Sequence, residues 1–338
     1  MKRKTINLFF RKPVYGISYS VENFYRELIK NHKRKDLIFK IKVCPLESKG
    51  FFNRVVLIFW ALYNQADVNH ICGDINFISI LLNKRKTINT ILDFYSLKRL
   101  SGIKKIIYNL FWIKIPIFKS SQIIAISNKT KKEILKNTNT NTNKISVIDI
   151  CAQGMFKKKT KHTIRKKTRI LIVGTGKNKN LRNIFFSLKN VNCELAIIGI
   201  LSNEHIFFLK ELKIDYINFV ALAKKEILRQ YINCDMLVYA STYEGFGVPI
   251  LEAQSIGRSV ITSKLEPMTY VGGKGALYVN PNNIKSIRNG IIKIITNNKF
   301  RNKLIEKGFE NIKRFNKKKI FNNYLNCYNN ILRKKSLL

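Results

Sequence analysis

The chain has 338 residues, of which 46% are hydrophobic and 25% are charged. This composition excludes an intrinsically disordered chain, and the length leaves room for two domains that each have their own core. Only 16 glycines and 6 prolines occur, which excludes a low-complexity linker of the Gly/Ser-rich or proline-rich type.

The net charge is the most unusual feature, because 63 Lys and Arg stand against 20 Asp and Glu, giving +43. Three interpretations compete. The first is a drift of composition toward Lys, Asn and Ile, since no single block holds the charge. The second is attachment to an anionic membrane surface, where each basic residue near the headgroups contributes about 1 kcal/mol. The third is nucleic acid, but no nucleic-acid motif accompanies the charge, so no specific nucleic acid is expected as a partner.

The cysteines are widely spaced, and no two lie at a metal-ligand interval, so we expect neither a zinc site nor a disulfide framework. We interpret them as buried thiols in a reducing compartment. Residues 6–10 are too short an apolar stretch for a signal-peptide core, and residues 55–63 are far below the ~20 residues of a spanning helix. We therefore expect a cytoplasmic protein, with peripheral attachment to the cytosolic face of a membrane as an alternative.

The pattern of apolar residues predicts alternating strands and helices in both halves of the chain. Predicted strands of the first half are residues 5–10, 37–43, 67–72, 88–92, 122–126 and 145–150. Predicted helices of that half are residues 19–31, the segment 54–63, which we expect to be buried, and a helix through residue 135 that Ser127 caps.

The second half repeats the alternation after a segment, residues 157–168, that is nearly devoid of apolar side chains. Predicted strands are residues 169–173, 194–198, 216–219, 235–239, 259–262 and 277–279, and predicted helices are 181–188, 204–210, 225–233 and 249–256. This order implies an α/β fold with two Rossmann-like domains that face each other across a cleft. The expected boundaries are a domain over 1–156, a basic linker over 157–168, a domain over 169–315, and a C-terminal helix over 316–338 that packs back on the first domain.

A loop between a predicted strand and a predicted helix carries Glu244, Gly245 and Gly247. The two glycines allow close approach of the backbone, and the start of the next helix provides a partial positive charge suited to a diphosphate. Glu252 lies one turn into that helix, where its carboxylate can accept hydrogen bonds from the hydroxyls of a ribose. The alternative interpretation is a strand-to-helix turn in which the glycines only make the bend.

Glu244 and Glu252 are the ends of an E-x7-E element, and residues 244–253 read Glu-Gly-Phe-Gly-Val-Pro-Ile-Leu-Glu-Ala. This segment resembles that of retaining family 4 (glycosyl transferases group 1) glycosyltransferases, which have the GT-B fold. The resemblance implies that Glu244 contacts the donor sugar and is catalytic, and that Glu252 contacts the ribose. The other donor-binding residues that it implies in this loop are Gly245, Phe246, Gly247 and Val248.

Residues 171–181 resemble the first strand of the family's donor domain, where a Lys-Asn pair opens the helix. By that resemblance Lys179 neutralises the donor diphosphate and takes part in catalysis, while Gly174, Thr175 and Asn180 line the donor site. The Gly-x-Gly by itself is a weak signal, and an ordinary helix cap is the alternative. The domain over 169–315 is then the nucleotide-sugar-binding domain, and the domain over 1–156 lies on the acceptor side.

The N-terminal half departs from the family pattern. Residues 90–94 resemble a family stretch that normally reads Thr-Ile-His-Asp; Asp93 remains as a catalytic candidate, but Leu92 replaces the histidine. His70, at a strand end expected to face the cleft, is the candidate substitute, with a structural histidine as the alternative. Gly16 belongs to a segment that resembles the family's glycine loop, so Gly16 and His70 are the acceptor-side candidates.

Two further departures lie in the C-terminal half, where Tyr270 stands in place of the usual glutamate and Lys274 in place of a common acidic residue.

The resemblance implies retaining transfer of a hexose-type sugar from a nucleotide-sugar to a glycan or lipid-linked acceptor of the cell envelope, as in polysaccharide or lipopolysaccharide synthesis. No metal and no other cofactor are expected, because no acidic cluster such as Asp-x-Asp is evident and Lys179 with the helix start supplies positive charge. One alternative is a catalytically impaired homologue that binds the sugar nucleotide, motivated by Leu92 and Tyr270. Another is a basic nucleic-acid-associated protein, motivated only by the charge.

Residues 103–118 interleave aromatic and aliphatic side chains with lysines. Such a pattern is typical of a helix that lies in a membrane interface. A core helix with an exposed basic edge is the alternative. If this segment contacts lipid, an anionic membrane surface is a further partner.

Overall fold

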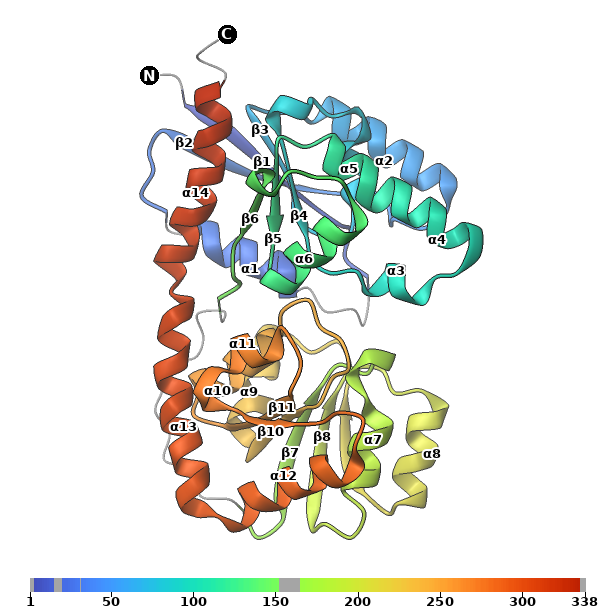
Figure 1. The fold of residues 1–338 in the computed structure, drawn as a ribbon, viewed down its shortest axis with the longest axis vertical. Coiled ribbons are helices and arrows are strands. Elements are labelled where there is room, and N and C mark those ends of the chain that lie inside the picture. Colours follow the sequence, from blue (N-terminus) through green and yellow to red (C-terminus); the bar gives the residue numbers. More distant parts are fainter. Residues whose placement is uncertain (1–2, 15–19, 31, 152–164, 335–338) are drawn as a thin grey trace. The chain divides into compact units, whose positions relative to one another are not determined.

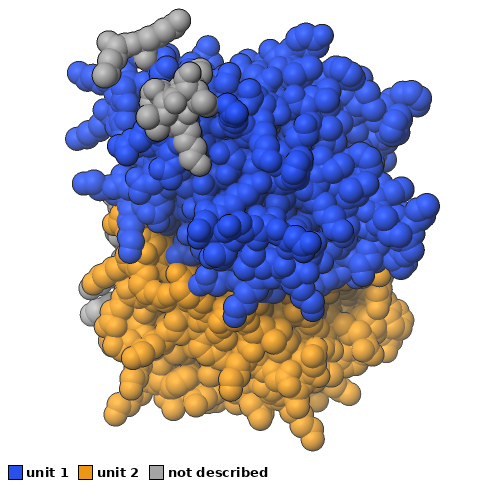
Figure 2. Space-filling view, turned by 45° about the horizontal axis from the view of Figure 1, so that its top comes forward, with its two compact units in different colours: residues 1–14, 19–150, 317–338 blue, residues 15–18, 151–316 orange. Residues whose placement is uncertain are grey.

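The computed structural model describes residues 3–14, 20–30, 32–151 and 165–334 (Figure 1). The chain divides into two compact units, coloured separately in Figure 2. Unit 1 comprises residues 1–14, 19–150 and 317–338, and unit 2 comprises residues 15–18 and 151–316. The candidate residue Gly16 and most of the predicted linker, residues 157–164, lie outside the described residues.

Unit 1 contains a parallel sheet whose strands follow the order β2-β1-β3-β4-β5-β6. Its strands are β1 (Lys4–Phe10), β2 (Leu37–Val43), β3 (Val68–Ile71), β4 (Thr87–Ile91), β5 (Gln122–Ala125) and β6 (Ile145–Val147). Its helices are α1 (Ser20–Ile29), α2 (Phe51–Tyr63), η1 (Asn76–Leu81), η2 (Lys84–Lys86), α3 (Tyr95–Arg99), α4 (Gly102–Tyr108), η3 (Asn109–Lys114), α5 (Ile115–Phe118), α6 (Asn128–Asn137), η4 (Thr142–Lys144) and α14 (Lys317–Lys334).

Unit 2 contains a second parallel sheet, with the strand order β12-β11-β10-β7-β8-β9. Its strands are β7 (Thr168–Val173), β8 (Cys193–Ile198), β9 (Asp215–Phe219), β10 (Met236–Tyr239), β11 (Ser259–Ser263) and β12 (Leu277–Val279). Its helices are η5 (Lys177–Lys179), α7 (Leu181–Ser187), α8 (Asn203–Glu211), α9 (Lys224–Asn233), α10 (Val248–Ser255), α11 (Met268–Gly272), η6 (Gly273–Gly275), α12 (Ile284–Thr296), α13 (Asn298–Ile312) and η7 (Lys313–Phe315).

The predicted α/β class and the two Rossmann-like sheets are confirmed. Central strands such as β3, β4 and β10 are buried along their whole length, as expected for parallel strands covered by helices on both faces. The predicted cap is also confirmed, because the Ser127 hydroxyl accepts a hydrogen bond from the backbone N–H of Thr130 at 3.1 Å. All six cysteines are buried, as predicted. No helix among the described residues is both long and apolar enough to cross a membrane.

The prediction that residues 54–63 form a buried helix is wrong in its burial. Helix α2 forms as expected, but within it only Leu57 and Ala61 are buried. The run is apolar all round, which by itself suggests a core helix. The structure instead packs one side of α2 against the sheet and η1 and leaves large apolar side chains of the other side exposed.

The C-terminal helix α14 is held on unit 1 by a buried polar network. The Tyr328 hydroxyl lies 2.9 Å from His70 Nδ1, and His70 Nε2 lies 2.8 Å from Thr90 Oγ1. The Tyr25 hydroxyl lies 2.8 Å from Thr90 Oγ1 and 3.1 Å from the Tyr324 hydroxyl. The network therefore joins α14 to β3, β4 and α1, although α14 follows them by more than two hundred residues.

His70 titrates far from the ordinary range because burial lowers its pKa to about 3. In the unfolded chain a histidine has a pKa near 6.5, so between about pH 6.5 and pH 3 only the unfolded state binds this proton. The unit must therefore lose stability as the pH falls through this window. We expect His70→Gln to reduce the loss of unfolding free energy between pH 7 and pH 5 by about 2 kcal/mol.

Urea unfolding of the wild type and the variant at both pH values measures this difference. His205→Gln is the matched control, because the pKa of His205 is lowered by desolvation at a site that is only partly buried. An equal pH dependence in the wild type and His70→Gln would contradict the assignment of a neutral His70.

Candidate functional site

The candidate site is built where two neighbouring strands of unit 2 end. Strands β7 and β10 pair in parallel, with Ile170 opposite Met236 and Leu171 opposite Leu237. Because parallel strands share their carboxyl edge, the loops that follow β7 and β10 leave the sheet side by side. This is why Lys179 and Glu244, 65 residues apart, meet.

The turn from β10 into α10 depends on glycine. Gly247 adopts φ 113°, in the left-handed region where a side chain is strained, and it stands at the N-cap of α10. A proline in the first turn of α10 fits because its missing N–H is not needed there. Phe246 is buried against Phe315, with ring centroids 5.9 Å apart, which fixes the loop to the body of unit 2.

The loop after β7 is shaped to carry Lys179 across the edge of the sheet. Gly174 adopts φ 87°, and a Cβ there would lie 2.8 Å from Cε of Lys179, so the lysine side chain passes directly over this glycine. Asn180 adopts φ 61°, and its amide donates to the carbonyl oxygens of Ala240 and Pro281 at 3.0 and 2.7 Å. Asn180 therefore ties this loop to the segments after β10 and β12.

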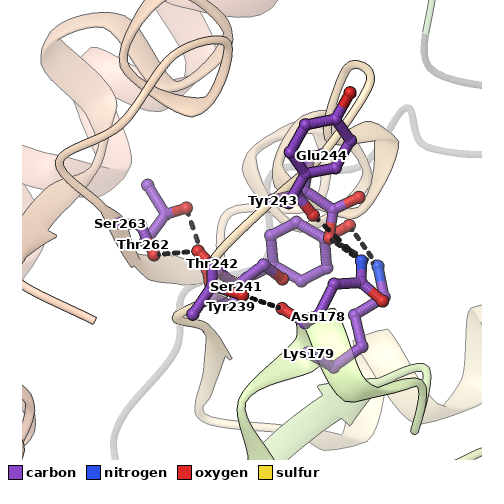
Figure 3. Close-up of polar contacts among 9 residues, drawn as sticks. All are labelled: Asn178, Lys179, Tyr239, Ser241, Thr242, Tyr243, Glu244, Thr262 and Ser263. Atoms are coloured by element: carbon purple, nitrogen blue, oxygen red, sulfur yellow. Dashed lines mark hydrogen bonds and ion pairs between the residues drawn. The ribbon is translucent and has the colours of Figure 1, made fainter. Parts of the chain in front are cut away.

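Lys179 and Glu244 form an ion pair that links the two loops (Figure 3). Nζ of Lys179 donates to Oε1 of Glu244 at 2.6 Å and to the Tyr239 hydroxyl at 2.8 Å. Both charged side chains are largely shielded, with exposed fractions of 19% and 11%. Burial and the negative charge of Glu244 raise the pKa of Tyr239 well above its usual value, so the Tyr239 hydroxyl stays protonated.

Asn178 closes the contact between the loops (Figure 3). Its side-chain amide donates to the Tyr243 carbonyl at 2.9 Å, and its backbone carbonyl accepts from the N–H of Thr242 at 2.8 Å. Ser263, at the end of β11, donates from its hydroxyl to the carbonyl of Ser241 at 2.6 Å. The loop of Glu244 is thus fixed from both neighbouring strands.

Glu252 lies on α10 beyond this cluster. The hydroxyl of the wholly buried Tyr231, at the end of α9, donates to Oε2 of Glu252 at 2.6 Å. Desolvation raises the pKa of Glu252, and the bond from Tyr231 acts in the opposite direction. The bond therefore fixes the orientation of the carboxylate and favours its charged form.

The structure places the predicted donor-binding residues together at one edge of unit 2. It brings an ammonium, a carboxylate, a helix N-terminus and a second carboxylate into one region. The predicted residue Thr175 holds two loops together, since its hydroxyl donates a hydrogen bond to the carbonyl of Ile200 at 2.6 Å. Among the residues that the structure describes, no group of three or more His, Cys, Asp or Glu is placed to hold a metal ion.

The candidates of unit 1 lie in a separate unit and have different surroundings. Asp93 follows β4, and its Oδ1 accepts a hydrogen bond from the backbone N–H of Tyr95, the first residue of α3, at 2.8 Å. His70 is wholly buried, and both of its ring nitrogens have hydrogen-bond partners within unit 1. The expectation that His70 faces an open cleft is therefore corrected: it is a core residue that anchors α14.

Sequence reasoning missed three side chains that organise the site, namely Asn178, Tyr231 and Tyr239. Asn178 directly precedes Lys179, and Tyr239 is the last residue of β10, before the loop of Glu244, so the parallel arrangement of β7 and β10 could have suggested them. Tyr231 lies 21 residues before Glu252 on another helix, and no motif connects the two positions.

The second half of the chain matches a known protein family. Residues 155–311 match the family described as glycosyl transferases group 1. The chain is 28% identical over 236 residues to the O-antigen chain mannosyltransferase RfbU of Salmonella typhimurium. That alignment covers 66% of this chain and 64% of RfbU, so the chain matches less than two thirds of the length of this relative.

Solved structures share the fold over nearly the whole chain. A sucrose-phosphate synthase from Thermosynechococcus elongatus superimposes with a TM-score of 0.82 at 13% identity, covering 98% of this chain and 100% of that one. The Anabaena protein HepE in complex with UDP-glucose superimposes with a TM-score of 0.72 at 13% identity, covering 99% and 100%. These identities establish the fold alone. The chain has the GT-B fold, and its residues 155–311 match the glycosyl transferases group 1 family.

Proposed function

We propose that this chain is a glycosyltransferase that moves a hexose-type sugar from a nucleotide-sugar to a glycan or lipid-linked acceptor in the synthesis of a cell-envelope polysaccharide. The observation that carries the proposal is the convergence of Lys179, Glu244 and Glu252 at one edge of unit 2. The family match over residues 155–311 and the similarity to an O-antigen mannosyltransferase support it.

The donor occupies the edge where β7 and β10 end. Glu252, oriented by Tyr231, accepts hydrogen bonds from the two ribose hydroxyls. The diphosphate lies at the N-terminus of α10, where the helix dipole and the first N–H groups favour an anion. An ammonium group carries more donors than its bonds to Glu244 and Tyr239 use, so Lys179 contacts the same diphosphate.

Charge separation explains why these groups accelerate transfer. As the glycosidic bond to phosphate breaks, the sugar becomes oxocarbenium-like and the leaving diphosphate gains negative charge. Lys179 and the N-terminus of α10 stabilise the charge on the leaving group, in positions that are fixed before the reaction. Glu244 faces the sugar, where its carboxylate orients the donor and complements the positive charge of the transition state.

The stereochemical outcome and the acceptor form a finer part of the proposal. Retention of configuration follows from the resemblance to retaining family 4, and a metal is not required because Lys179 and α10 supply the positive charge at the diphosphate. Asp93, after β4 of unit 1, is the catalytic candidate on the acceptor side.

A mannose donor is the first to test, because the relative RfbU is named a mannosyltransferase. UDP-glucose is the second, because the structure of HepE contains it.

A second candidate is a homologue that binds the sugar nucleotide but transfers slowly. Leu92 directly follows β4, at the position where the family has a histidine, and the buried His70 does not replace that histidine. Donor binding without transfer to any acceptor, and without hydrolysis above background, distinguishes this candidate from the enzyme.

Removal of the lysine charge tests the enzyme directly. We expect Lys179→Met to reduce the turnover number by about 10²- to 10³-fold, since the loss of one preorganised donor to developing charge has this effect in other enzymes. The measurement is release of nucleoside diphosphate from GDP-mannose and UDP-glucose, with lipid-linked oligosaccharide as acceptor.

Lys177→Met is the matched control, because Lys177 belongs to the same short helix η5 but is exposed to solvent. Equal losses in the two variants would show that only the general positive charge of the loop matters. Wild-type turnover in Lys179→Met would remove Lys179 from the mechanism.

The bond between Tyr231 and Glu252 predicts a change in the pH dependence of donor binding. The bond lowers the pKa of Glu252, so Tyr231→Phe must raise that pKa further. The ionised carboxylate is the form that accepts from both ribose hydroxyls, so binding is lost at a higher pH in the variant. We expect the pH profile of binding to move upward, together with a loss of about 3- to 10-fold in affinity at neutral pH.

Titration calorimetry with UDP and GDP between pH 5 and pH 8 measures both effects. Tyr216→Phe, on strand β9 of the same unit, is the control for loss of a tyrosine hydroxyl. A uniform loss of affinity with no change in the pH profile would mean that Tyr231 supports the fold and does not tune Glu252.

A further inference from the structure

Helix α2 leaves an apolar stripe in solvent. Phe52, Val56, Phe59 and Tyr63 recur at helical spacing and therefore lie on one face. Phe52 and Tyr63 are exposed to 82% and 84%, and Val56 and Phe59 are each about half exposed. Transfer of such side chains from water to an apolar environment is favourable in free energy, so an exposed face of this kind indicates a binding surface.

The continuous helical segment α4–η3 carries a second stripe. Ile103, Ile106, Ile107 and Leu110 follow the spacing of one helical face, and none of them is buried. Ile103 and Ile106 are exposed to 71% and 67%. The alternative of a core helix with a basic edge is therefore wrong for this part of residues 103–118, because its apolar side chains face the solvent.

The two stripes belong to neighbouring parts of unit 1. The Arg54 guanidinium of α2 lies 4.8 Å from the centroid of the Trp112 ring in η3. The Trp112 ring also packs against Phe77 of η1, with ring centroids 4.8 Å apart, and α2 packs on the same η1. In Figure 1, α2 and α4 lie at the same end of unit 1. We refer to the exposed apolar side chains of α2 and α4–η3 as the apolar patch.

The two sequence segments that carry the apolar patch contain basic residues and no carboxylates. Residues 48–66, which include α2, and residues 94–132, which include α4 and η3, contain no Asp or Glu. Lys104, Lys105 and Lys114 alternate with the apolar side chains and are exposed. Nearby, Nζ of Lys84 lies 4.1 Å from the centroid of the Phe118 ring.

We propose that the apolar patch docks unit 1 on an anionic lipid surface. Apolar side chains enter the interface between headgroups and acyl chains, while adjacent lysines contact the lipid phosphates. With 13 residues, α2 is too short to span a bilayer of about 30 Å and lies in the plane of the interface. A second copy of the chain is a poorer occupant, because a two-fold interface would bring identical lysines together.

The proposal concerns where the chain binds and does not depend on glycosyl transfer. Its test uses the full-length wild-type protein and vesicles of phosphatidylcholine, alone or with a third phosphatidylglycerol, separated by sedimentation. We expect the protein to sediment with the anionic vesicles and to stay in the supernatant with the neutral ones.

The double variant Phe52→Ser, Ile106→Ser tests the apolar contribution. Both side chains are exposed, so the melting temperature should stay close to that of the wild type, while vesicle affinity falls by about tenfold or more. Ile200→Ser, Phe207→Ser is the matched control, since these side chains of unit 2 are 57% and 58% exposed. Equal losses in the two double variants would overturn the proposal.

The double variant Lys104→Glu, Lys105→Glu tests the charge. Each basic residue near an anionic surface contributes a factor of about five in affinity, so we expect at least a 20-fold loss. Lys299→Glu, Lys303→Glu on α13 has the same net charge and should lose much less. Equal losses would show that the total charge of the chain acts without a defined surface, which would overturn the proposal.

Two other results would also overturn it. One is the absence of sedimentation with vesicles of any composition. The other is self-association of the wild type in vesicle-free sedimentation velocity that Phe52→Ser, Ile106→Ser abolishes, because the patch would then be the interface between two copies of the chain.

Discussion

The parallel pairing of β7 with β10 is the constraint on which the candidate site depends. It makes two loops leave one edge of the sheet, and the ion pair between Lys179 and Glu244 joins them there. Two glycines also help to bring these side chains together. Gly174 leaves room for the Lys179 side chain, and Gly247 allows the turn of the chain into α10. The site is therefore a consequence of strand order, and the catalytic proposal follows from the charges that this order collects.

Unit 1 has its own constraint, the buried network in which Tyr25, Thr90 and His70 meet two tyrosines of α14. Polar groups buried in this way must find partners, so the network fixes the last helix against the sheet. A histidine that looked like a possible reacting group is thereby a structural one. The same unit exposes apolar side chains on α2 and α4, which lie in segments without Asp or Glu. In unit 1, the buried side chains therefore stabilise the fold, whereas the exposed apolar side chains form the surface that we propose binds a partner.

Much of the fold and part of the candidate site could be predicted from the sequence. Apolar periodicity predicted the strands and most helices, and the spacing of Glu244 and Glu252 pointed to the loop that we propose binds the donor. The exposure of individual side chains was less predictable, because an apolar run such as that of α2 has the same sequence pattern in a core helix as in an interfacial one. Long-range partners were unpredictable, since nothing in the sequence links Tyr231 to Glu252 or Tyr328 to His70.

The position of a bound nucleotide tests the account most directly. A crystal structure of the protein soaked with UDP or GDP should show the diphosphate within hydrogen-bond distance of Lys179 Nζ and the N-terminus of α10. The ribose hydroxyls should contact the carboxylate of Glu252. A nucleotide bound elsewhere on unit 2, or bound with Glu252 still facing only Tyr231, would contradict the proposed donor site.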